Sequence, residues 1–374
     1  MRDSELKSEA GEDCRGGDLF LPAIPWVLCL HGGVQTRVEI ADFENWRAVA
    51  GEAAEVLSSG EVVAVPTETV YGLAACAFDA AAVARIFAAK ERPAFDPLIV
   101  HVSGLRDLGR VAVVPEGIKE VVKDLAEAFW PGPLTLVLPR HEDVPDLVTS
   151  GLSTVAVRAS NHEVMRYLTK KLGPLAAPSA NRFGRISPTS ASAVMSELEG
   201  RIPLIVDGGA CTNGLESTIV AVEEGEKRPT LRLLRPGPVT REELRRFGRV
   251  VKAGRVTRGR PEAPGTLESH YAPMAPVHLF EKPEEFVPEE GKNYALLSYR
   301  GDPRDGYVER HAWSRVEVLS PGKGKLAEAA VRFFFALRAL DTGKIDAIVA
   351  EPVSDVGLGS AIMDRLRRAA AKRP

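Results

Sequence analysis

Short apolar runs recur along this chain, and several of them are followed by proline, glycine or polar residues. One of the first, Val62–Val65, stops at Pro66 and opens into the polar loop 67–69. A run of this length predicts a buried strand, and hydroxyl groups at a strand end are typical of the floor of a small-molecule site. An ordinary strand and turn show the same pattern, so only similar stretches further along the chain can strengthen the interpretation as a small-molecule site.

Amphipathic segments separate these runs, which indicates an α/β domain built on a mixed, twisted sheet. Helices are expected at residues 43–59, 80–90 and 116–129. Strands are expected at residues 62–65, 97–102, 134–138, 154–158, 175–177, 204–206, 217–222 and 231–234. In the second helix Lys90 shares a face with the apolar Val83, so its side chain is expected to point into the protein.

A smaller, Rossmann-like α/β domain is predicted at the C-terminal end, with strands at 294–299, 315–319 and 346–350 and helices at 324–341 and 359–372. Before it, eight basic side chains between Arg241 and Arg260 precede a stretch that contains proline and glycine. We interpret that segment as a helix followed by a linker. The predicted organisation is a catalytic domain at 37–248, an interdomain linker at 249–275 and a C-terminal domain at 276–374.

Residues 1–36 differ from the rest of the chain. Their first part is charged and mostly acidic, whereas a signal peptide begins with a basic region. Their apolar part, residues 20–30, is interrupted by Pro22 and Pro25. We therefore expect a disordered extension, for which an over-long translation start is one explanation.

Composition narrows the class of protein. The length of 374 residues suggests two domains of ~150 residues, and no apolar run is long enough for a membrane span. A formal charge of −3 argues against a general nucleic-acid binder. The four cysteines are scattered, which fits a reducing cytoplasm. The sequence has no GxxxxGK(S/T) phosphate loop, no GxGxxG after a strand and no HExxH metal motif.

The polar groups that remain lie at the ends of predicted strands and helices. They are Lys90, Arg92, Thr154, Arg158, Ser179, Asn181, Ser187, Ser217 and Arg235. Four cations with hydroxyl and amide donors would suit a polyphosphate. Each residue also has a structural explanation: Lys90 could complement a helix dipole, worth ~0.3–1 kcal/mol, and Ser179 and Asn181 could be turn formers.

Taken together, six stretches resemble the YrdC-like family in order and spacing, over about residues 43–245. They are Val65–Leu73, Lys90–Pro93, Pro97–His101, Trp130–Thr135, Ala177–Asn181 and Leu234–Gly237. Linker residues 263–273 and the C-terminal stretch Gly357–Arg365 are similar to the long, two-domain form of that family, the L-threonylcarbamoyladenylate synthases.

The resemblance implies a nucleotidyltransferase that converts L-threonine, bicarbonate and ATP into threonylcarbamoyl-AMP and pyrophosphate. The product would serve threonylcarbamoyladenosine modification beside the anticodon of tRNA, with tRNA acted on indirectly through a downstream transferase complex. The enzyme would need no membrane and no dedicated metal ligands, because Mg²⁺ would be held mainly by the phosphates.

The same resemblance assigns roles to individual residues. Lys90 and Arg92 would be catalytic and would bind ATP with Ala94, Thr154, Ser179, Asn181, Ser187, Arg235 and Tyr271. The residues around threonine would be Thr67, His101, Arg158, Ala177 and Ser217. If threonine reacts as its carbamate, the substrate carries its own nucleophile, and the protein has only to orient two anions and offset their charge. Arg158 is the candidate for the threonine carboxylate.

Two features depart from the family pattern. Ser160 stands two residues after Arg158, where family members usually have proline, and the linker 264–270 has acidic and neutral groups where lysines are common. An alternative function is an RNA-binding module that uses a basic concave surface extended by the run from Arg241 to Arg260. The negative overall charge and the lack of aromatic residues among those cations argue against it.

Overall fold

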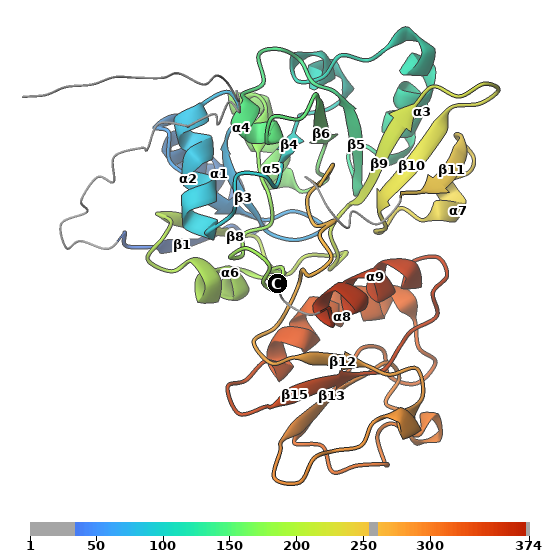
Figure 1. The fold of residues 1–374 in the computed structure, drawn as a ribbon. Coiled ribbons are helices and arrows are strands. Elements are labelled where there is room, and N and C mark those ends of the chain that lie inside the picture. The colour runs from blue at the N-terminus through green and yellow to red at the C-terminus, as the bar shows by residue number, and fades with distance from the viewer. Residues whose placement is uncertain (1–33, 254–260, 372–374) are drawn as a thin grey trace, which may run out of the picture. The chain divides into compact units, whose positions relative to one another are not determined.

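The computed structural model describes residues 34–253 and 261–371, which build one large and one small β-sheet with their helices (Figure 1). Residues 1–33 of the predicted extension and residues 254–260 of the basic run lie outside the described residues. None of the described helices combines the length and the apolar character that a membrane span requires.

The large sheet has eleven strands in the order β1-β8-β2-β3-β7-β4-β6-β5-β9-β10-β11. Parallel and antiparallel neighbours alternate irregularly: β4 runs parallel to β6, for example, whereas β5 runs antiparallel to it. The strands are β1 Arg37–Ile40, β2 Val63–Val65, β3 Gly72–Cys76, β4 Ile99–His101, β5 Leu134–Pro139, β6 Thr154–Arg158, β7 Leu175–Ala176, β8 Leu204–Asp207, β9 Thr218–Glu223, β10 Thr230–Arg235 and β11 Arg249–Lys252.

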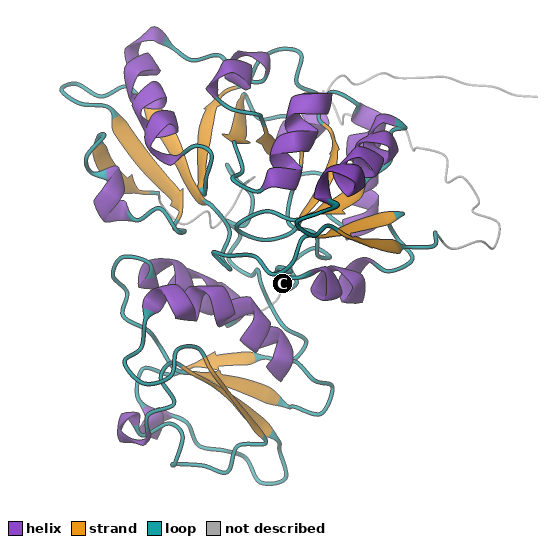
Figure 2. Cartoon of the chain, turned by 180° about the vertical axis from the view of Figure 1, so that it is seen from behind, coloured by secondary structure: helices purple, strands orange, loops and turns teal. Residues whose placement is uncertain are grey.

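Helices cover the large sheet on both faces, as the cartoon in Figure 2 shows. A central strand such as β2 is apolar throughout for that reason: Val63 and Val65 face a core with α1 and α5, whereas Ala64 faces a core with α2 and α3. The helices of this part are α1 Trp46–Ser58, α2 Ala80–Lys90, α3 Lys119–Phe129, α4 Asp146–Thr149, α5 Glu163–Leu172, α6 Ala191–Leu198 and α7 Arg241–Leu244, with short 3₁₀ turns at Leu105–Arg110 and Glu116–Ile118.

The small sheet consists of four parallel strands in the order β12-β15-β13-β14. Its elements are β12 Val277–Leu279, β13 Tyr294–Ser298, β14 Arg315–Val318, α8 Leu326–Leu340, β15 Ala347–Ala350 and α9 Gly359–Ala369, with 3₁₀ turns at Pro283–Glu285 and Pro303–Asp305. The apolar stripe predicted for the middle helix is buried, since Phe333, Phe334 and Leu337 of α8 are at most 1% exposed.

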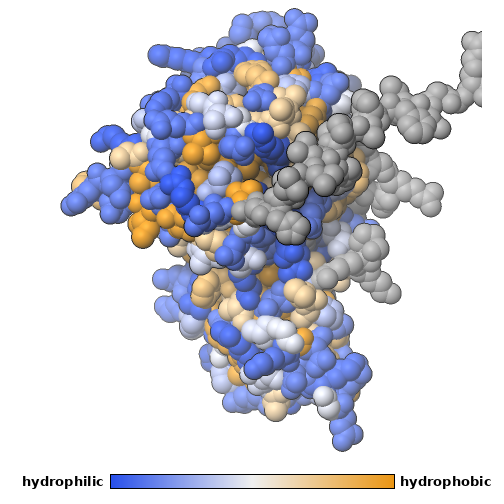
Figure 3. Space-filling model, turned by 90° about the vertical axis from the view of Figure 1, so that its left-hand side faces the viewer, coloured by the Kyte–Doolittle hydropathy of each residue, from blue (hydrophilic) through white to orange (hydrophobic). Residues whose placement is uncertain are grey.

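The predicted fold class is confirmed: a mixed α/β sheet is followed by a smaller parallel α/β sheet. The helix predicted to open the 241–275 segment is present as α7, Arg241–Leu244, but the segment predicted as a linker from residue 249 begins with strand β11, Arg249–Lys252, beside β10. The β-branched pair Val250-Val251 favours the strand. Away from these cores the surface is mostly hydrophilic, with scattered apolar patches, as is normal for a globular protein (Figure 3).

Two phenylalanines of α8 test the core of the small sheet. Phe333→Ala should lower the free energy of unfolding by about 3–5 kcal/mol, because Phe333 is fully buried and its removal leaves a cavity. Phe335→Ala, on the same helix but 61% exposed, should change it by less than ~0.5 kcal/mol. Urea unfolding measures both, and equal effects would contradict this packing.

Candidate active site

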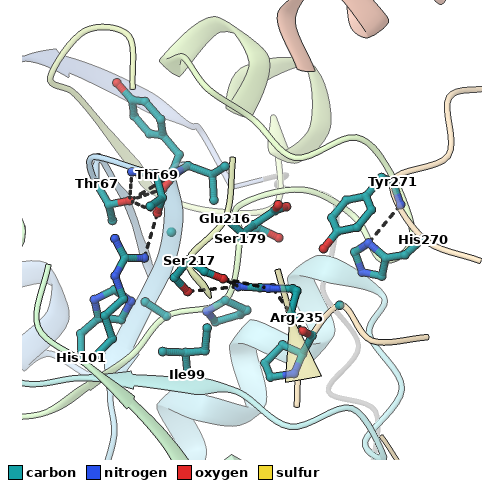
Figure 4. A pocket seen from close by; sticks show the side chains of 18 of the residues that line it. Thr67, Thr69, Ile99, His101, Ser179, Glu216, Ser217, Arg235, His270 and Tyr271 are labelled. Carbon is teal, nitrogen blue, oxygen red and sulfur yellow. Dashed lines mark hydrogen bonds between the residues drawn. The ribbon is translucent and has the colours of Figure 1, made fainter. Parts of the chain in front are cut away.

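A pocket lies where the ends of several strands of the large sheet meet the segment 263–272. Figure 4 shows Thr67, Thr69 and His101 toward one end and His270 and Tyr271 toward the other, with Ser217 and Arg235 between them. The lining residues come from the β2–β3 loop, β4, the end of β6, the segment after β7, the start of β9 and the end of β10. Residues distant in sequence are thus brought to one edge of the sheet, as the predictions required.

Arg158 forms a buried ion pair at the threonine end of this predicted site. Its Nη2 lies 2.5 Å from Glu68 Oε1, its Nη1 donates to Thr69 Oγ1 at 2.8 Å, and its Nε donates to the Gly132 carbonyl. Ser160, which stands where the family usually has proline, donates a hydrogen bond to the other Glu68 oxygen. Three of the five guanidinium hydrogens are therefore engaged, and two remain for a ligand.

The pKa of Glu68 reflects this arrangement. Burial would raise it, but the charge of Arg158 and the hydrogen bonds from Ser160 and Arg158 outweigh burial and lower it from 4.5 to about 2. Glu68 is thus an anion that anchors the guanidinium of Arg158.

His101 lies beside this ion pair as a neutral imidazole. Burial, together with the nearby charge of Arg158, lowers its pKa from 6.5 to about 3. Its side chain lines the pocket, and its Nδ1 has no hydrogen-bond partner among the described residues. The ring can therefore offer a substrate a hydrogen-bond acceptor without adding charge.

Lys90 and Arg92 are buried beneath the loop that follows β7. Lys90 is 1% exposed, as its place on the apolar face of α2 predicted, and its ammonium donates to the carbonyls of Ser179 and Asn181. Arg92 donates to the Pro97 carbonyl at 2.8 Å and lies 2.9 Å from Asp96 Oδ2. Burial lowers the pKa of both cations, most strongly that of Lys90. The Lys90 head group thus fixes the backbone of the Ser179–Asn181 turn.

Arg235 connects the end of β10 to the neighbouring walls of the pocket. Its Nη2 donates to Ser217 Oγ at 3.1 Å, and its Nη1 donates to the Pro264 carbonyl at 3.2 Å. Ser217 Oγ in turn lies 2.7 Å from Thr135 Oγ1. The guanidinium is 3% exposed, so it presents a desolvated positive charge to the pocket.

Glu216 is the carboxylate among the described residues that line the pocket. One of its oxygens accepts a hydrogen bond from Ser187 Oγ, and the other lies 3.1 Å from the Arg365 Nε.

Tyr271 also lines the pocket and has a left-handed backbone conformation, with φ of 62°, which is rare for a residue with a bulky side chain.

The structure gathers most, but not all, of the predicted site residues in the pocket. All five predicted threonine residues line it, as do four of the predicted nucleotide residues. The nine are Thr67, His101, Arg158, Ala177, Ser217, Arg92, Ser179, Arg235 and Tyr271. Five others do not line it: Lys90, Ala94, Thr154, Asn181 and Ser187. Lys90 and Ser187 instead hold residues that do, whereas Thr154 begins β6, four residues and ~13 Å from Arg158.

The pocket has a volume of about 40 Å³. That is room for a few water molecules, whereas sites for small-molecule ligands measure roughly 300–1,000 Å³. Pro264, Gly265, His270 and Tyr271 occupy one side of it. In this arrangement the pocket is therefore too small for a nucleotide.

Comparison with known proteins places the chain in a family. A family described as "Telomere recombination" matches residues 55–237, and "Threonylcarbamoyl-AMP synthase, C-terminal domain" matches residues 239–371. The threonylcarbamoyl-AMP synthase of Pyrococcus abyssi is 40% identical over 335 residues, which cover 88% of this chain and 96% of that protein. The enzyme of that name from Bacillus subtilis is 39% identical over 331 residues, 86% of this chain and 93% of its own length. The chain belongs to the threonylcarbamoyl-AMP synthase family.

Solved structures agree with this membership of the threonylcarbamoyl-AMP synthase family. The crystal structure of P. abyssi Sua5 complexed with L-threonine has a TM-score of 0.76 and 39% identity, and covers 90% of this chain and 97% of that one. A variant of P. abyssi Sua5, in which a histidine and the tyrosine after it are alanine, has a TM-score of 0.78 and 38% identity, covering 90% and 96%. The present chain has one His-Tyr dipeptide, His270-Tyr271, in the pocket wall.

Two acidic residues of the site were not assigned a function from the sequence. Glu68 was recognised only as part of the polar loop 67–69, and Glu216 was given no role although it directly precedes Ser217. A carboxylate within three residues of a buried strand was the available signal, because burial requires it to have a cationic partner.

The Glu68–Arg158 pair makes a pH-dependent contribution to stability. The lowered pKa means that the unfolded chain takes up a proton first, so this contribution is complete above about pH 4.5 and is lost as the pH falls toward 2. Glu68→Gln should cost about 3–5 kcal/mol at pH 7, since Arg158 loses its counter-charge, and the cost should shrink as the pH is lowered through that window.

Urea unfolding between pH 2.5 and pH 7 measures this contribution. Glu61→Gln is the control, because the Glu61–Arg85 pair is exposed and should contribute less than ~1 kcal/mol. Parallel pH profiles of wild type and Glu68→Gln would show that Glu68 does not titrate in this way.

Proposed function

We propose that this chain makes threonylcarbamoyl-AMP and pyrophosphate from L-threonine, bicarbonate and ATP. The observation that carries the proposal is the pocket itself. Arg158, which donates to Thr69, and neutral His101 lie at one end of it, and the buried cations Arg92 and Arg235 line the part beyond that end. A small zwitterion suits that end, and a polyphosphate suits the part that the two cations line. P. abyssi Sua5, solved with L-threonine, supports the same assignment.

Threonine would bind with its carboxylate on the two free guanidinium hydrogens of Arg158. His101 Nδ1 would accept a hydrogen bond from the substrate N–H, and the Thr67 and Thr69 hydroxyls lie in the same wall of the pocket. Because the pKa of His101 is about 3, the imidazole would act as an acceptor that orients the amine rather than as a general base.

The reaction would proceed without a nucleophile from the protein. The threonine amine adds to bicarbonate with loss of water, and an oxygen of the resulting carbamate attacks the α-phosphorus of ATP. The bond from that phosphorus to the bridging oxygen breaks, and pyrophosphate leaves with the electron pair. Arg92 and Arg235, which are 8% and 3% exposed, would offset the charge that develops on the leaving group.

The donor set of the pocket fits a Mg²⁺ ion that arrives on the phosphates. Among the described residues, no group of three or more histidine, cysteine or carboxylate side chains could hold a metal, and Glu216 is already paired with Arg365. Such an ion would be held mainly by the phosphates and would neutralise part of their charge.

Threonylcarbamoyl-AMP would then pass to a downstream transferase complex that modifies tRNA. Both steps would take place in the cytoplasm.

Entry of ATP and release of pyrophosphate would both require the segment 263–272 to open, because the pocket has a volume of only about 40 Å³ in this arrangement. Gly265 is a constrained point in that segment: its φ is 68°, and a Cβ there would lie 2.5 Å from the Tyr271 hydroxyl.

Purified protein mixed with ATP, Mg²⁺, bicarbonate and threonine should release pyrophosphate, and omission of threonine or bicarbonate should abolish that release. Mass spectrometry should detect threonylcarbamoyl-AMP. Release that does not depend on both substrates would contradict the proposed function.

Arg92→Met should lower turnover by at least ~100-fold, the loss typical of a missing electrostatic contact in the transition state. Lys90→Met should lower turnover as well, because the Ser179–Asn181 turn loses the ammonium that holds its carbonyls. Arg85→Met is the matched control on helix α2, since Arg85 is half exposed and pairs with Glu61 outside the pocket. It should retain full turnover. Circular dichroism at the assay temperature checks folding, and turnover above a tenth of wild type in a folded Arg92→Met protein would remove Arg92 from the proposed mechanism.

A further inference from the structure

The C-terminal stretch Gly357–Arg365 has no part in the proposed chemistry, yet one of its residues reaches the pocket wall. Arg365 lies on α9, beside the small sheet, and its side chain is 0% exposed. A buried arginine requires partners for its charge. Those partners lie mainly in the catalytic part of the chain.

The contacts of Arg365 converge on Glu216. Its Nε lies 3.1 Å from Glu216 Oε2, its Nη2 lies 3.4 Å from the Glu216 carbonyl, and its Nη1 donates to the Pro236 carbonyl and to Asp364. Its Cζ also lies 5.4 Å from the centre of the Tyr271 ring, within cation–π range. One guanidinium thus touches both Glu216 and Tyr271, which line the pocket.

Glu216 poses an electrostatic problem for a nucleotide site. Its carboxylate is buried and lines a pocket whose other charged lining residues, Arg92, Arg158 and Arg235, are cations. An unpaired carboxylate there would repel phosphates with little screening, because water is excluded. Glu216 also holds Ser187, so it cannot turn away without loss of that hydrogen bond.

We propose that Arg365 is a positioning residue of the nucleotide site: it neutralises Glu216, and it holds Glu216 and Tyr271 in the wall that faces the phosphates. The small C-terminal domain is then part of the site rather than an attachment to it. This inference rests on the proposed function, because it takes ATP as the ligand. Arg365 itself does not line the pocket, so it acts through Glu216 and Tyr271.

A second arginine of the same domain, Arg338, distinguishes a role in the nucleotide site from a contact that only joins the two domains. Arg338 on α8 lies 3.0 Å from Glu197 Oε1 and donates to the Ile186 carbonyl at 2.7 Å. Glu197 is 5% exposed and the Arg338 side chain is 25% exposed, so this pair is a partly buried ion pair between the small domain and the catalytic part. Neither residue lines the pocket. Arg338 is therefore the matched control for contact without a role in the site.

The test compares Arg365→Met with Arg338→Met in the full chain. Both should lower Tm, but Arg365→Met alone should weaken binding of a non-hydrolysable ATP analogue at least tenfold and raise the KM for ATP by a similar factor. The KM for threonine should stay within twofold of wild type. Arg365→Lys, which keeps the charge, should lose less than threefold in affinity for the analogue.

The double variant Arg365→Met/Glu216→Gln supplies the decisive measurement. If an uncompensated carboxylate causes the defect, removal of its charge should restore affinity for the analogue to within about threefold of wild type. Equal affinities for Arg365→Met and Arg338→Met, or a double variant no better than Arg365→Met, would overturn the proposal. If Arg365→Met does not fold, the affinities of the double variant and of Arg365→Lys for the analogue are compared with those of Arg338→Met and the wild type instead.

Failure of the proposed function gives a different result. Calorimetry with the analogue measures binding without turnover, so it tests Arg365 even if the wild type releases no pyrophosphate. If the wild type releases no pyrophosphate in response to threonine and bicarbonate, the proposed reaction is wrong, but the role of Arg365 in nucleotide binding is not affected.

Discussion

Four cations lie buried at one edge of the large sheet, and each has oxygen atoms within hydrogen-bonding distance. Lys90 is held by the carbonyls of Ser179 and Asn181, Arg92 by those of Asp96 and Pro97, Arg158 by Glu68 and Arg235 by Ser217 and Pro264. A charge removed from water costs several kcal/mol unless such partners surround it. The loops at the strand ends are therefore shaped by the cations, and the positively charged pocket exists before any ligand arrives.

Sequence patterns predicted the elements that are both apolar and periodic. Residues 154–158 and 80–90 form β6 and α2 with the expected bounds, because apolar side chains recur there with the period of a strand or a helix. Strand β3 was not predicted, since Gly72–Cys76 consists of glycine, leucine, alanine and cysteine rather than β-branched residues. Helices α5 and α6 were not predicted either, although α5 is amphipathic.

Only part of the candidate site could be predicted from the sequence. The resemblance supplied Thr67, His101 and Arg158, which meet in the pocket, and the apolar face of α2 correctly placed Lys90 inside the protein. Pairings such as Glu68 with Arg158, and Glu216 with Arg365, join residues 90 and 149 positions apart. Neither local propensity nor periodicity reports on contacts of that range, because they depend on how the whole sheet is assembled.

The Arg365–Glu216 pair also bears on how such a chain can be shortened. A protein that ended after β11 would keep the large sheet and the four buried cations, but its pocket would hold one more uncompensated negative charge. A chain without the C-terminal domain that kept Glu216 would need another cation beside it, and a neutral residue at this position would remove that need. The presence of the C-terminal domain and the residue type at the position of Glu216 are therefore expected to depend on each other.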